Sequence, residues 1–280
     1  MTTQVQPKSK NITANGINLH YLDWGTEGQP PMVLLHGLRG HANVWEDVAV
    51  ALCNDYHVYS LDQRGRGDTD HAPGGDYSTD AFVADLAGFA DAIGLDKFIL
   101  FGHSMGGRNS MAFAGQYPDR LERLCIVDIG PRIEPAGGNR ITEELRNLPP
   151  EFDSFEDALA HVQTGNRFAA EPVMRRRLAG QSQQLPDGKI VWKFDPAIRE
   201  QRINGTAAPA ADLWPTLERI TCPTLLVRGT ETDLLTEETA RQMVDTLAQG
   251  TLAEIERAGH MVFEDNPADF IAAVKGWLAS

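Results

Sequence analysis

Residues 98–117 read FILFGHSMGGRNSMAFAGQY. The four apolar residues at the start predict a buried strand, and the residues after Ser104 predict a helix. Ser104 therefore lies on a strand-to-helix turn, in the pattern Gly-x-Ser-x-Gly from Gly102 to Gly106. Such a turn exposes the serine side chain, and glycines flank it because a Cβ would collide with the neighbouring strand or helix. The stretch predicts a nucleophilic serine; the other interpretation of the same residues is a serine that caps a helix.

A serine hydroxyl needs a general base near neutral pH, and the base needs a group that orients it. His260 lies in AGHMVFEDNP (258–267), after the last predicted strand and before the last predicted helix. Loops that follow the strands of an open parallel sheet share one edge, so we expect His260 beside Ser104. His103 is adjacent to the serine in the chain, and we expect it to point elsewhere and pack within the turn.

Two aspartates compete for the orienting position. Asp128 ends the predicted strand at LCIVD, and a buried carboxylate there needs a partner, which the Nδ1–H of His260 would supply. Asp233 follows another predicted strand in RGTETDLL (228–235), where the competing interpretation is a loop residue that faces water. We favour Asp128 and keep Asp233 as the alternative acid.

Acyl transfer also needs N–H donors for the oxyanion that develops on the substrate. The backbone N–H of Met105, directly after the serine and at a helix N-terminus, is one candidate. The second is expected from HGLRG (36–40), which follows the predicted strand Met32–Leu35 and whose small residues let the backbone approach a substrate. The N–H of Leu38 is our candidate in that loop.

Short apolar runs alternate with helical stretches along most of the chain. An N-terminal hairpin is expected over residues 11–24, around the strong turn pair Asn15-Gly16. Strands separated by crossover helices predict a parallel sheet with right-handed connections. The predicted strands are Met32–Leu35, His57–Leu61, Phe98–Phe101, Leu124–Ile129, Thr224–Val227 and Leu252–Ile255, and the helices are Asn43–Leu52, Thr79–Ile93, the stretch after Ser104, Thr236–Leu247 and Pro267–Leu278.

The alternation breaks over residues 131–212, which contain no clear buried strand. Two helices are predicted there, Ser154–Val162 and Pro172–Gln183. We therefore expect one α/β core made of residues 1–130 and 213–280, interrupted by an insertion. The insertion also contains the consecutive arginines Arg175–Arg177. Consecutive residues point in different directions around a helix, so we expect these arginines on a face exposed to solvent rather than converging on a substrate.

Composition excludes several classes of function. The chain has 280 residues and a formal net charge of −14, which argues against nucleic-acid and anionic-membrane partners. Its N-terminus lacks the apolar stretch of a signal peptide, and no apolar run is long enough to span a membrane. Three cysteines cannot all pair, so buried free thiols and a cytoplasmic location are expected; they are Cys53, Cys125 and Cys222.

Four stretches together resemble the α/β-hydrolase superfamily in order and spacing, over nearly the whole chain: HGLRG (36–40), DQRGRGDTD (62–70), GHSMGG (102–107) and AGHMVFEDNP (258–267). The resemblance implies a mainly parallel eight-stranded sheet flanked by helices, and a helical cap inserted between the sixth strand and the helix preceding the seventh. Residues 131–212 match that cap, and the turn at 62–70 is implied to be structural.

The resemblance also bears on the acid and on the branch of the superfamily. The commonest arrangement places the acid three residues after the glycine of the loop at 228–235, where this chain has Thr232, one residue before Asp233. Some relatives carry the acid after the sixth strand instead, at the offset of Asp128. VDIGP (127–131) resembles the branch of small-ester carboxylesterases.

The expected function is a cofactor-independent serine hydrolase that cleaves small to medium carboxylic esters through an acyl-enzyme. A serine rather than an aspartate at position 104 argues against epoxide opening and halide displacement. The sequence has no Asp, His or Cys cluster with the spacing of metal ligands and no glycine-rich phosphate loop, so no metal or cofactor is expected. Trp192 and Phe168 are candidate substrate contacts. The alternatives are hydrolysis of a lactone, a thioester or a carbon–carbon bond, or a ligand receptor with little turnover. A homodimer is also possible from the sequence.

Overall fold

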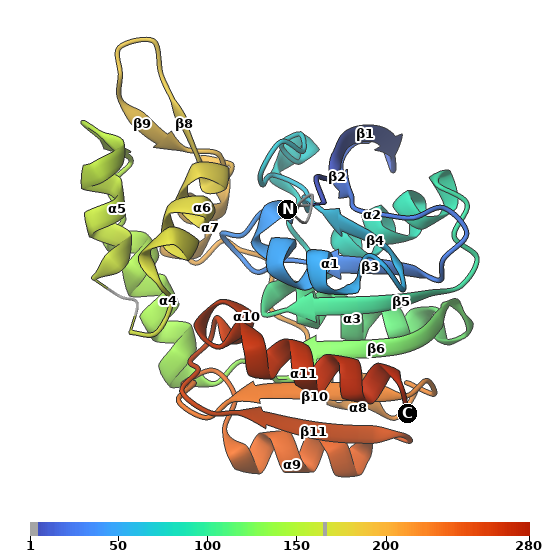
Figure 1. Ribbon diagram of the computed structural model, residues 1–280. Coiled ribbons are helices and arrows are strands. Elements are labelled where there is room, and N and C mark those ends of the chain that lie inside the picture. The colour runs from blue at the N-terminus through green and yellow to red at the C-terminus, as the bar shows by residue number, and fades with distance from the viewer. Residues whose placement is uncertain (1–4, 165–166) are drawn as a thin grey trace.

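An eight-stranded sheet forms the centre of the computed structural model, which describes residues 5–164 and 167–280 (Figure 1). The strand order is β1-β2-β4-β3-β5-β6-β10-β11. The pairs β1–β2 and β2–β4 are antiparallel and the other pairs are parallel. This arrangement confirms the expected fold class. The strands are β1 (Lys8–Ala14), β2 (Ile17–Asp23), β3 (Pro31–Leu35), β4 (His57–Leu61), β5 (Phe98–His103), β6 (Leu121–Val127), β10 (Thr224–Gly229) and β11 (Gly250–Ile255).

The first two strands form the predicted hairpin. Asn15 and Gly16 both have positive φ, 49° and 74°, and they connect Ala14 to its cross-strand partner Ile17. Two consecutive residues of this kind make the turn whose twist matches that of the flanking strands. Asparagine and glycine are the residues that adopt this conformation at least cost.

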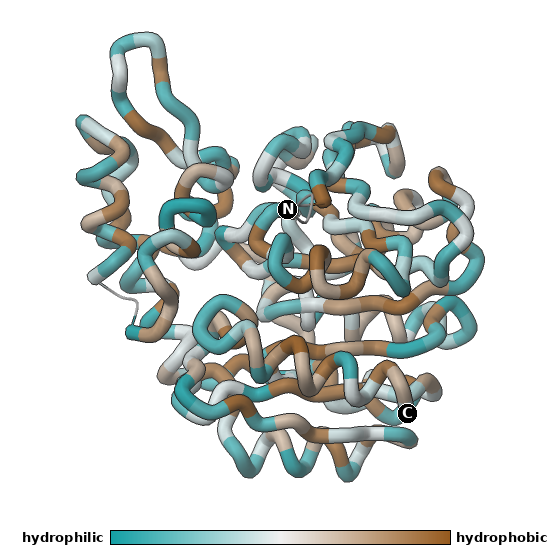
Figure 2. The backbone as a smooth tube through the Cα atoms, viewed as in Figure 1, coloured by the Kyte–Doolittle hydropathy of each residue, from teal (hydrophilic) through white to brown (hydrophobic). Residues whose placement is uncertain are grey.

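Helices cover both faces of the sheet, and hydrophobic residues gather along the central strands (Figure 2). All six residues of β5 are buried, as expected for a strand between two helical layers. One hydrophobic cluster joins the sheet to α2 (Thr79–Ala92), α3 (Met105–Gln116), α8 (Trp214–Leu217) and α9 (Glu237–Thr246), and the other joins it to α1 (Glu46–Leu52), α10 (Val262–Asp265) and α11 (Pro267–Leu278).

Residues 131–212, the inserted segment, lie beside the carboxyl ends of the parallel strands (Figure 1). The expectation of a purely helical insertion is wrong, because its described residues include a small antiparallel sheet in the order β7-β9-β8. These strands have only two or three residues each, too few for an alternating pattern to show. The elements are α4 (Pro135–Asn147), β7 (Glu151–Phe152), α5 (Phe155–Gln163), α6 (Glu171–Gln181), β8 (Ser182–Gln184), β9 (Ile190–Trp192) and α7 (Pro196–Asn204).

The arginine run of α6 joins the inserted segment to the core, so the expectation of a wholly solvated face is also wrong. Arg175 does lie on the surface, paired with acidic residues of the inserted segment itself. Arg176 forms an ion pair with Asp47 of α1. Arg177 donates from Nη1 to the carboxylate of Glu264 at 2.6 Å; Glu264 is buried and Arg177 is largely buried.

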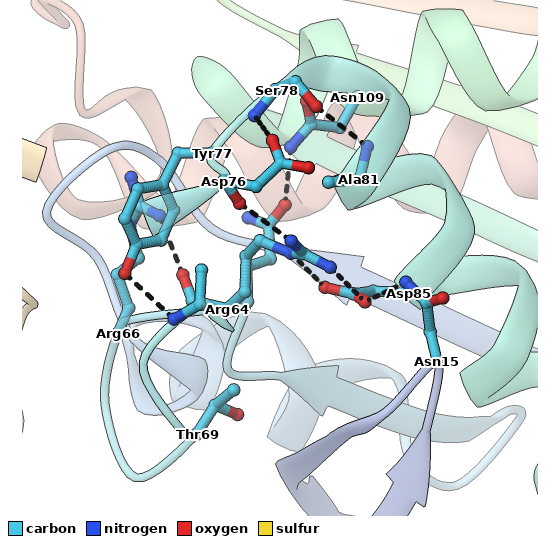
Figure 3. Close-up of polar contacts among 12 residues, drawn as sticks. Asn15, Arg64, Arg66, Thr69, Asp76, Tyr77, Ser78, Ala81, Asp85 and Asn109 are labelled. Carbon is cyan, nitrogen blue, oxygen red and sulfur yellow. Dashed lines mark hydrogen bonds and ion pairs between the residues drawn. The ribbon is translucent and has the colours of Figure 1, made fainter. Parts of the chain in front are cut away.

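The turn after β4 contains a buried ion pair (Figure 3). Arg64 donates from Nε and Nη2 to the two carboxylate oxygens of Asp85 in α2, at 2.6 and 2.7 Å. The side-chain amide of Asn15 donates to the same carboxylate at 2.9 Å. The hairpin, the turn and α2 are thereby held together, which is the structural role implied for this turn.

The three cysteines are buried and unpaired, as predicted. Within the described ranges, none of the helices is both long and apolar enough to cross a bilayer.

Asp85→Asn should lower the free energy of unfolding by about 3–5 kcal/mol, because it leaves the Arg64 charge buried beside a neutral group. Asp91→Asn, in the same helix, is the matched control, since Asp91 is exposed and its ion pair with Arg120 lies at the surface. The control should change stability by less than about 1 kcal/mol. Urea denaturation followed by circular dichroism measures both; equal effects would contradict this account of the turn.

Candidate active site

Ser104 lies on a strained turn between β5 and α3. Its φ and ψ are 53° and −117°, a conformation that is unfavourable for any residue other than glycine. A Cβ on Gly102 would lie 2.3 Å from the Ser110 hydroxyl oxygen, and one on Gly106 would lie 2.5 Å from the carbonyl oxygen of Leu35. The glycines are therefore required by the close approach of β3 and α3 to the turn, as the Gly-x-Ser-x-Gly pattern predicts.

His260 and Asp128 meet at the carboxyl end of the sheet. The Nδ1 of His260 lies 2.8 Å from Oδ2 of Asp128, whose side chain is completely buried. A carboxylate accepts hydrogen bonds only, so Nδ1 carries the proton and Nε2 is left as the basic nitrogen of the neutral ring. The structure thus brings His260 together with the aspartate that we favoured.

Asp128 also binds the loop after β10. Its Oδ1 accepts from the backbone N–H of Gly229 at 3.1 Å, and its Oδ2 accepts from the hydroxyl of Thr232 at 2.5 Å. Thr232 occupies the position where the resemblance places an acid, and here it donates a hydrogen bond to an acid on the neighbouring strand. Sequence reasoning noted the unusual residue at this position but missed its contact.

Asp233, the alternative acid, has a different partner. Both of its carboxylate oxygens accept from the Arg140 guanidinium of α4, at 2.5 and 2.8 Å. This hydrogen-bonded ion pair holds the pKa of Asp233 below its usual value. Asp233 thus links the loop after β10 to the inserted segment, and its oxygens are directed at an arginine rather than at His260.

His103 packs within the turn as expected, and it also holds the loop that carries His260. Its Nε2–H donates to the backbone carbonyl of His260 at 2.8 Å, and the centres of the two rings lie 4.6 Å apart. Burial holds the pKa of His103 well below 6.5, so the ring stays neutral. Asp265 fixes the same loop by accepting from the backbone N–H of Gly259 at 2.9 Å.

The loop that carries Leu38 is held by buried polar side chains. His36 accepts from the backbone N–H of Gln63 at its Nε2 and donates from Nδ1 to the carbonyl of Gly37, at 3.0 and 2.7 Å. Arg66 donates from Nε to the carbonyl of Leu38 at 3.0 Å and from Nη2 to the sulfur of Met105 at 3.4 Å. These contacts fix the peptide groups around the two candidate oxyanion donors before any substrate arrives.

Two cavities meet at the serine, and Leu38, Ser104 and Ile141 line both. The large cavity, of about 820 Å³, also contains His260 together with Phe168 and Trp192, the two predicted substrate contacts. The small cavity, of about 160 Å³, also contains Met105. Its remaining lining includes the aliphatic residues Ile129, Ile133, Ile198 and Leu234.

Trp192 and Phe168 reach the large cavity from different surroundings. The indole N–H of Trp192 donates to the carbonyl of Pro149 at 2.8 Å, and its ring packs against Phe152 and Phe194. Trp192 therefore also stabilises the inserted segment. Phe168 lies under the guanidinium of Arg167, 5.3 Å from the ring centre, and faces the large cavity.

One cluster of potential metal ligands occurs among the described residues, formed by His20, Asp62 and Asp68. Asp62 already accepts from the backbone N–H groups of Ala42 and Asp68 and from His20. Both of its oxygens are thus occupied by N–H donors that order the turn after β4, and we assign the cluster to that turn.

Comparison with known proteins shows what the chain as a whole is similar to. The sequence profile of the alpha/beta hydrolase fold family matches residues 30–267. A 3-hydroxybutyrate-oligomer hydrolase of Cupriavidus necator is 32% identical over 266 residues, which cover 90% of each chain. An N-formylmaleamate deformylase of Pseudomonas putida is 31% identical over 271 residues, covering 96% of this chain and 95% of the relative.

A third relative has been solved. An esterase of Mycobacterium tuberculosis is 27% identical over 278 residues, covering 97% of this chain and 89% of the relative. One of its structures superposes with a TM-score of 0.80 at 24% identity, over 98% of this chain and 93% of that one.

Asp128→Asn should lower kcat/KM for an activated ester by about 10³–10⁴-fold, because an amide cannot stabilise the imidazolium or hold the same ring tautomer. Asp233→Asn is the control from the competing loop. It should change kcat/KM by less than about fivefold, since it weakens only a partly exposed ion pair. The reverse order of effects would transfer the role to Asp233.

Proposed function

The chain belongs to the alpha/beta hydrolase fold family, and from that premise we propose that it is a cofactor-independent serine hydrolase that cleaves small to medium carboxylic esters through an acyl-enzyme. The observation that carries the proposal is the 2.8 Å contact between His260 and Asp128, next to a cavity that His260 shares with Ser104. A histidine whose Nδ1 is engaged by a buried carboxylate presents Nε2 as a general base.

The first half of the proposed reaction forms the acyl-enzyme. The Ser104 hydroxyl oxygen attacks the ester carbonyl while Nε2 of His260 takes its proton. The N–H groups of Leu38 and Met105 receive the oxyanion of the tetrahedral intermediate. His260 then returns the proton to the leaving alkoxide oxygen, so the alcohol departs neutral and the acyl group stays on Ser104.

In the second half, a water molecule repeats the sequence. His260 removes a proton from the water as its oxygen attacks the acyl carbon, and the proton passes to the Ser104 oxygen when the acid leaves. Asp128 stabilises the imidazolium in both halves. The bond cleaved is set by what the cavities accept rather than by this proton transfer.

Hydrolysis of a different bond is the second candidate. Relatives of similar identity include a deformylase as well as an esterase, so one framework serves several acyl groups. A lactone, thioester or carbon–carbon hydrolase would use the same three residues. A ligand receptor of this fold would instead release one burst of product and then stall.

We further propose that the inserted segment, residues 131–212, is a cap on the core of residues 1–130 and 213–280. Phe168 and Trp192 line the large cavity from this segment, and Ile141 reaches both cavities. A cap of this kind determines which substrates reach the serine and leaves the chemistry to the core.

The buried thiols of Cys53, Cys125 and Cys222 support a reducing compartment such as the cytoplasm.

Ser104→Ala should lower ester turnover by about 10⁴-fold or more while leaving the fold intact. The substrates are 4-nitrophenyl esters of increasing chain length, together with a lactone, a thioester and a formamide. A fluorophosphonate probe should label the wild-type protein at Ser104 and leave the variant unlabelled, as read by peptide mass spectrometry. Retention of a tenth of the activity, or labelling elsewhere, would remove Ser104 from the mechanism.

Phe168→Ala should change the ratio of kcat/KM between octanoyl and butyryl esters by about threefold to tenfold, because it enlarges the large cavity. Phe155→Ala is the matched control, since Phe155 packs within the inserted segment and lines neither cavity. Equal profiles for the two variants would count against a substrate contact at Phe168.

A further inference from the structure

Three arginines line the small cavity, and within the described part of the chain no aspartate or glutamate lines it with them. The cationic residues are Arg66 from the turn after β4, Arg108 from α3 and Arg202 from α7. The other lining residues are mainly aliphatic and aromatic. A cavity of this composition carries positive charge that its own walls do not neutralise.

The large cavity differs in this respect. Each arginine that lines it has an acidic partner within 3.4 Å. Uncompensated positive charge is therefore a property of the small cavity in particular and does not extend to the whole site. The pairs are Arg39–Glu144, Arg140–Asp233, Arg167–Glu231 and Arg177–Glu264.

The hydrogen-bond partners of Arg66 and Arg108 are neutral. Arg66 donates to the carbonyls of Leu38 and Arg64 and to the sulfur of Met105, and it lies over the Tyr77 ring. Arg108 donates to the carbonyls of Gly130, Pro131 and Ala211. Peptide carbonyls satisfy the N–H groups of a guanidinium but leave its full charge in place.

Asp195 acts through its charge on Arg66 and Asp212 on Arg108, but each acid has hydrogen-bond partners of its own. Asp195 accepts from the hydroxyl of Tyr77 and from the backbone N–H of Ala197. Asp212 pairs with Arg132 at 2.5 Å. Burial lowers the pKa of Arg66 to about 10 and also lowers the pKa of Arg108, as expected when a cation lacks a close counter-ion.

Arg202 retains an N–H group for a ligand. Its Nε donates to the hydroxyl of Thr142 at 3.1 Å and its Nη2 to the carbonyl of Gly138 at 3.2 Å. Among the described residues its Nη1 has no acceptor. The side chain is held in place by α4, and its remaining donor edge is available to the cavity.

We propose that the small cavity binds a carboxylate at one end of the substrate, with Arg202 as the residue that contacts it and Arg108 and Arg66 supplying a positive field. This inference rests on the proposed function and narrows its substrate class to esters that carry a free carboxylate on a short aliphatic chain. The aliphatic walls, Ile129, Ile133 and Ile198 among them, suit the chain, and a guanidinium edge suits the planar anion.

The test uses two pairs of esters in which a carboxylate is replaced by the isosteric carboxamide. Monoethyl glutarate and ethyl 4-carbamoylbutanoate vary the acyl arm. The esters 3-acetoxypropanoate and 3-acetoxypropanamide vary the alcohol arm. In at least one pair the wild-type enzyme should favour the carboxylate by about tenfold to one-hundredfold in kcat/KM, the range of a charge-assisted hydrogen bond.

Arg202→Gln should abolish most of that preference and Arg202→Lys should restore part of it. Arg199→Gln is the matched control, because Arg199 lies on the same helix, also donates to backbone carbonyls, and lines neither cavity. Melting followed by circular dichroism checks that each variant folds. A ratio near one in both pairs for the wild type, or an unchanged ratio in Arg202→Gln, would overturn the inference while ester hydrolysis itself stood.

If the enzyme turns over none of the esters, the hydrolase proposal fails. Calorimetric titration with glutarate then tests the anion subsite separately. Binding of glutarate that weakens by about tenfold in Arg202→Gln would still support the anion subsite. No detectable binding to the wild type would overturn the subsite as well.

Discussion

The buried carboxylate of Asp128 is the interaction on which the arrangement of the site depends. It accepts hydrogen bonds from two segments that are distant from it in the sequence: from the backbone of Gly229 and the hydroxyl of Thr232 at the end of β10, and from the ring of His260 after β11. A carboxylate removed from water is tolerated only when its oxygens are satisfied in this way. These hydrogen bonds fix the end of β6 relative to the end of β10 and to the loop that carries His260. Ser104 follows β5, the strand next to β6.

Local patterns in the sequence were enough to predict the sheet and much of the candidate site. The Asn15-Gly16 pair determines its own turn through two positive φ angles, and the glycines around Ser104 are dictated by contacts within a few ångströms. The hairpin signal depends on the backbone of adjacent residues alone, so it needs no knowledge of which distant segments meet. The contact of Gly106 is with Leu35 of β3, and the sequence reveals it only because the Gly-x-Ser-x-Gly pattern accompanies this kind of turn.

The inserted segment shows where such prediction ends. Its strands are too short to display a period, and α4 begins with Pro-Ala-Gly-Gly, which favours no helix by composition. The α7 helix could have been found, since Asp195 caps its start and Gly205 ends it in a left-handed conformation. The partner of Arg177 could not, because Glu264 belongs to α10, 87 residues further along the chain.

Thr232 also keeps the charge beside the imidazole simple. A carboxylate in place of its hydroxyl would face that of Asp128 across a single hydrogen-bond length. Two carboxylates so close share one proton and titrate as a pair, so the charge beside His260 would depend on both of them. The hydroxyl at position 232 donates the same hydrogen bond without adding a second acid, which leaves Asp128 as the acid in contact with the ring.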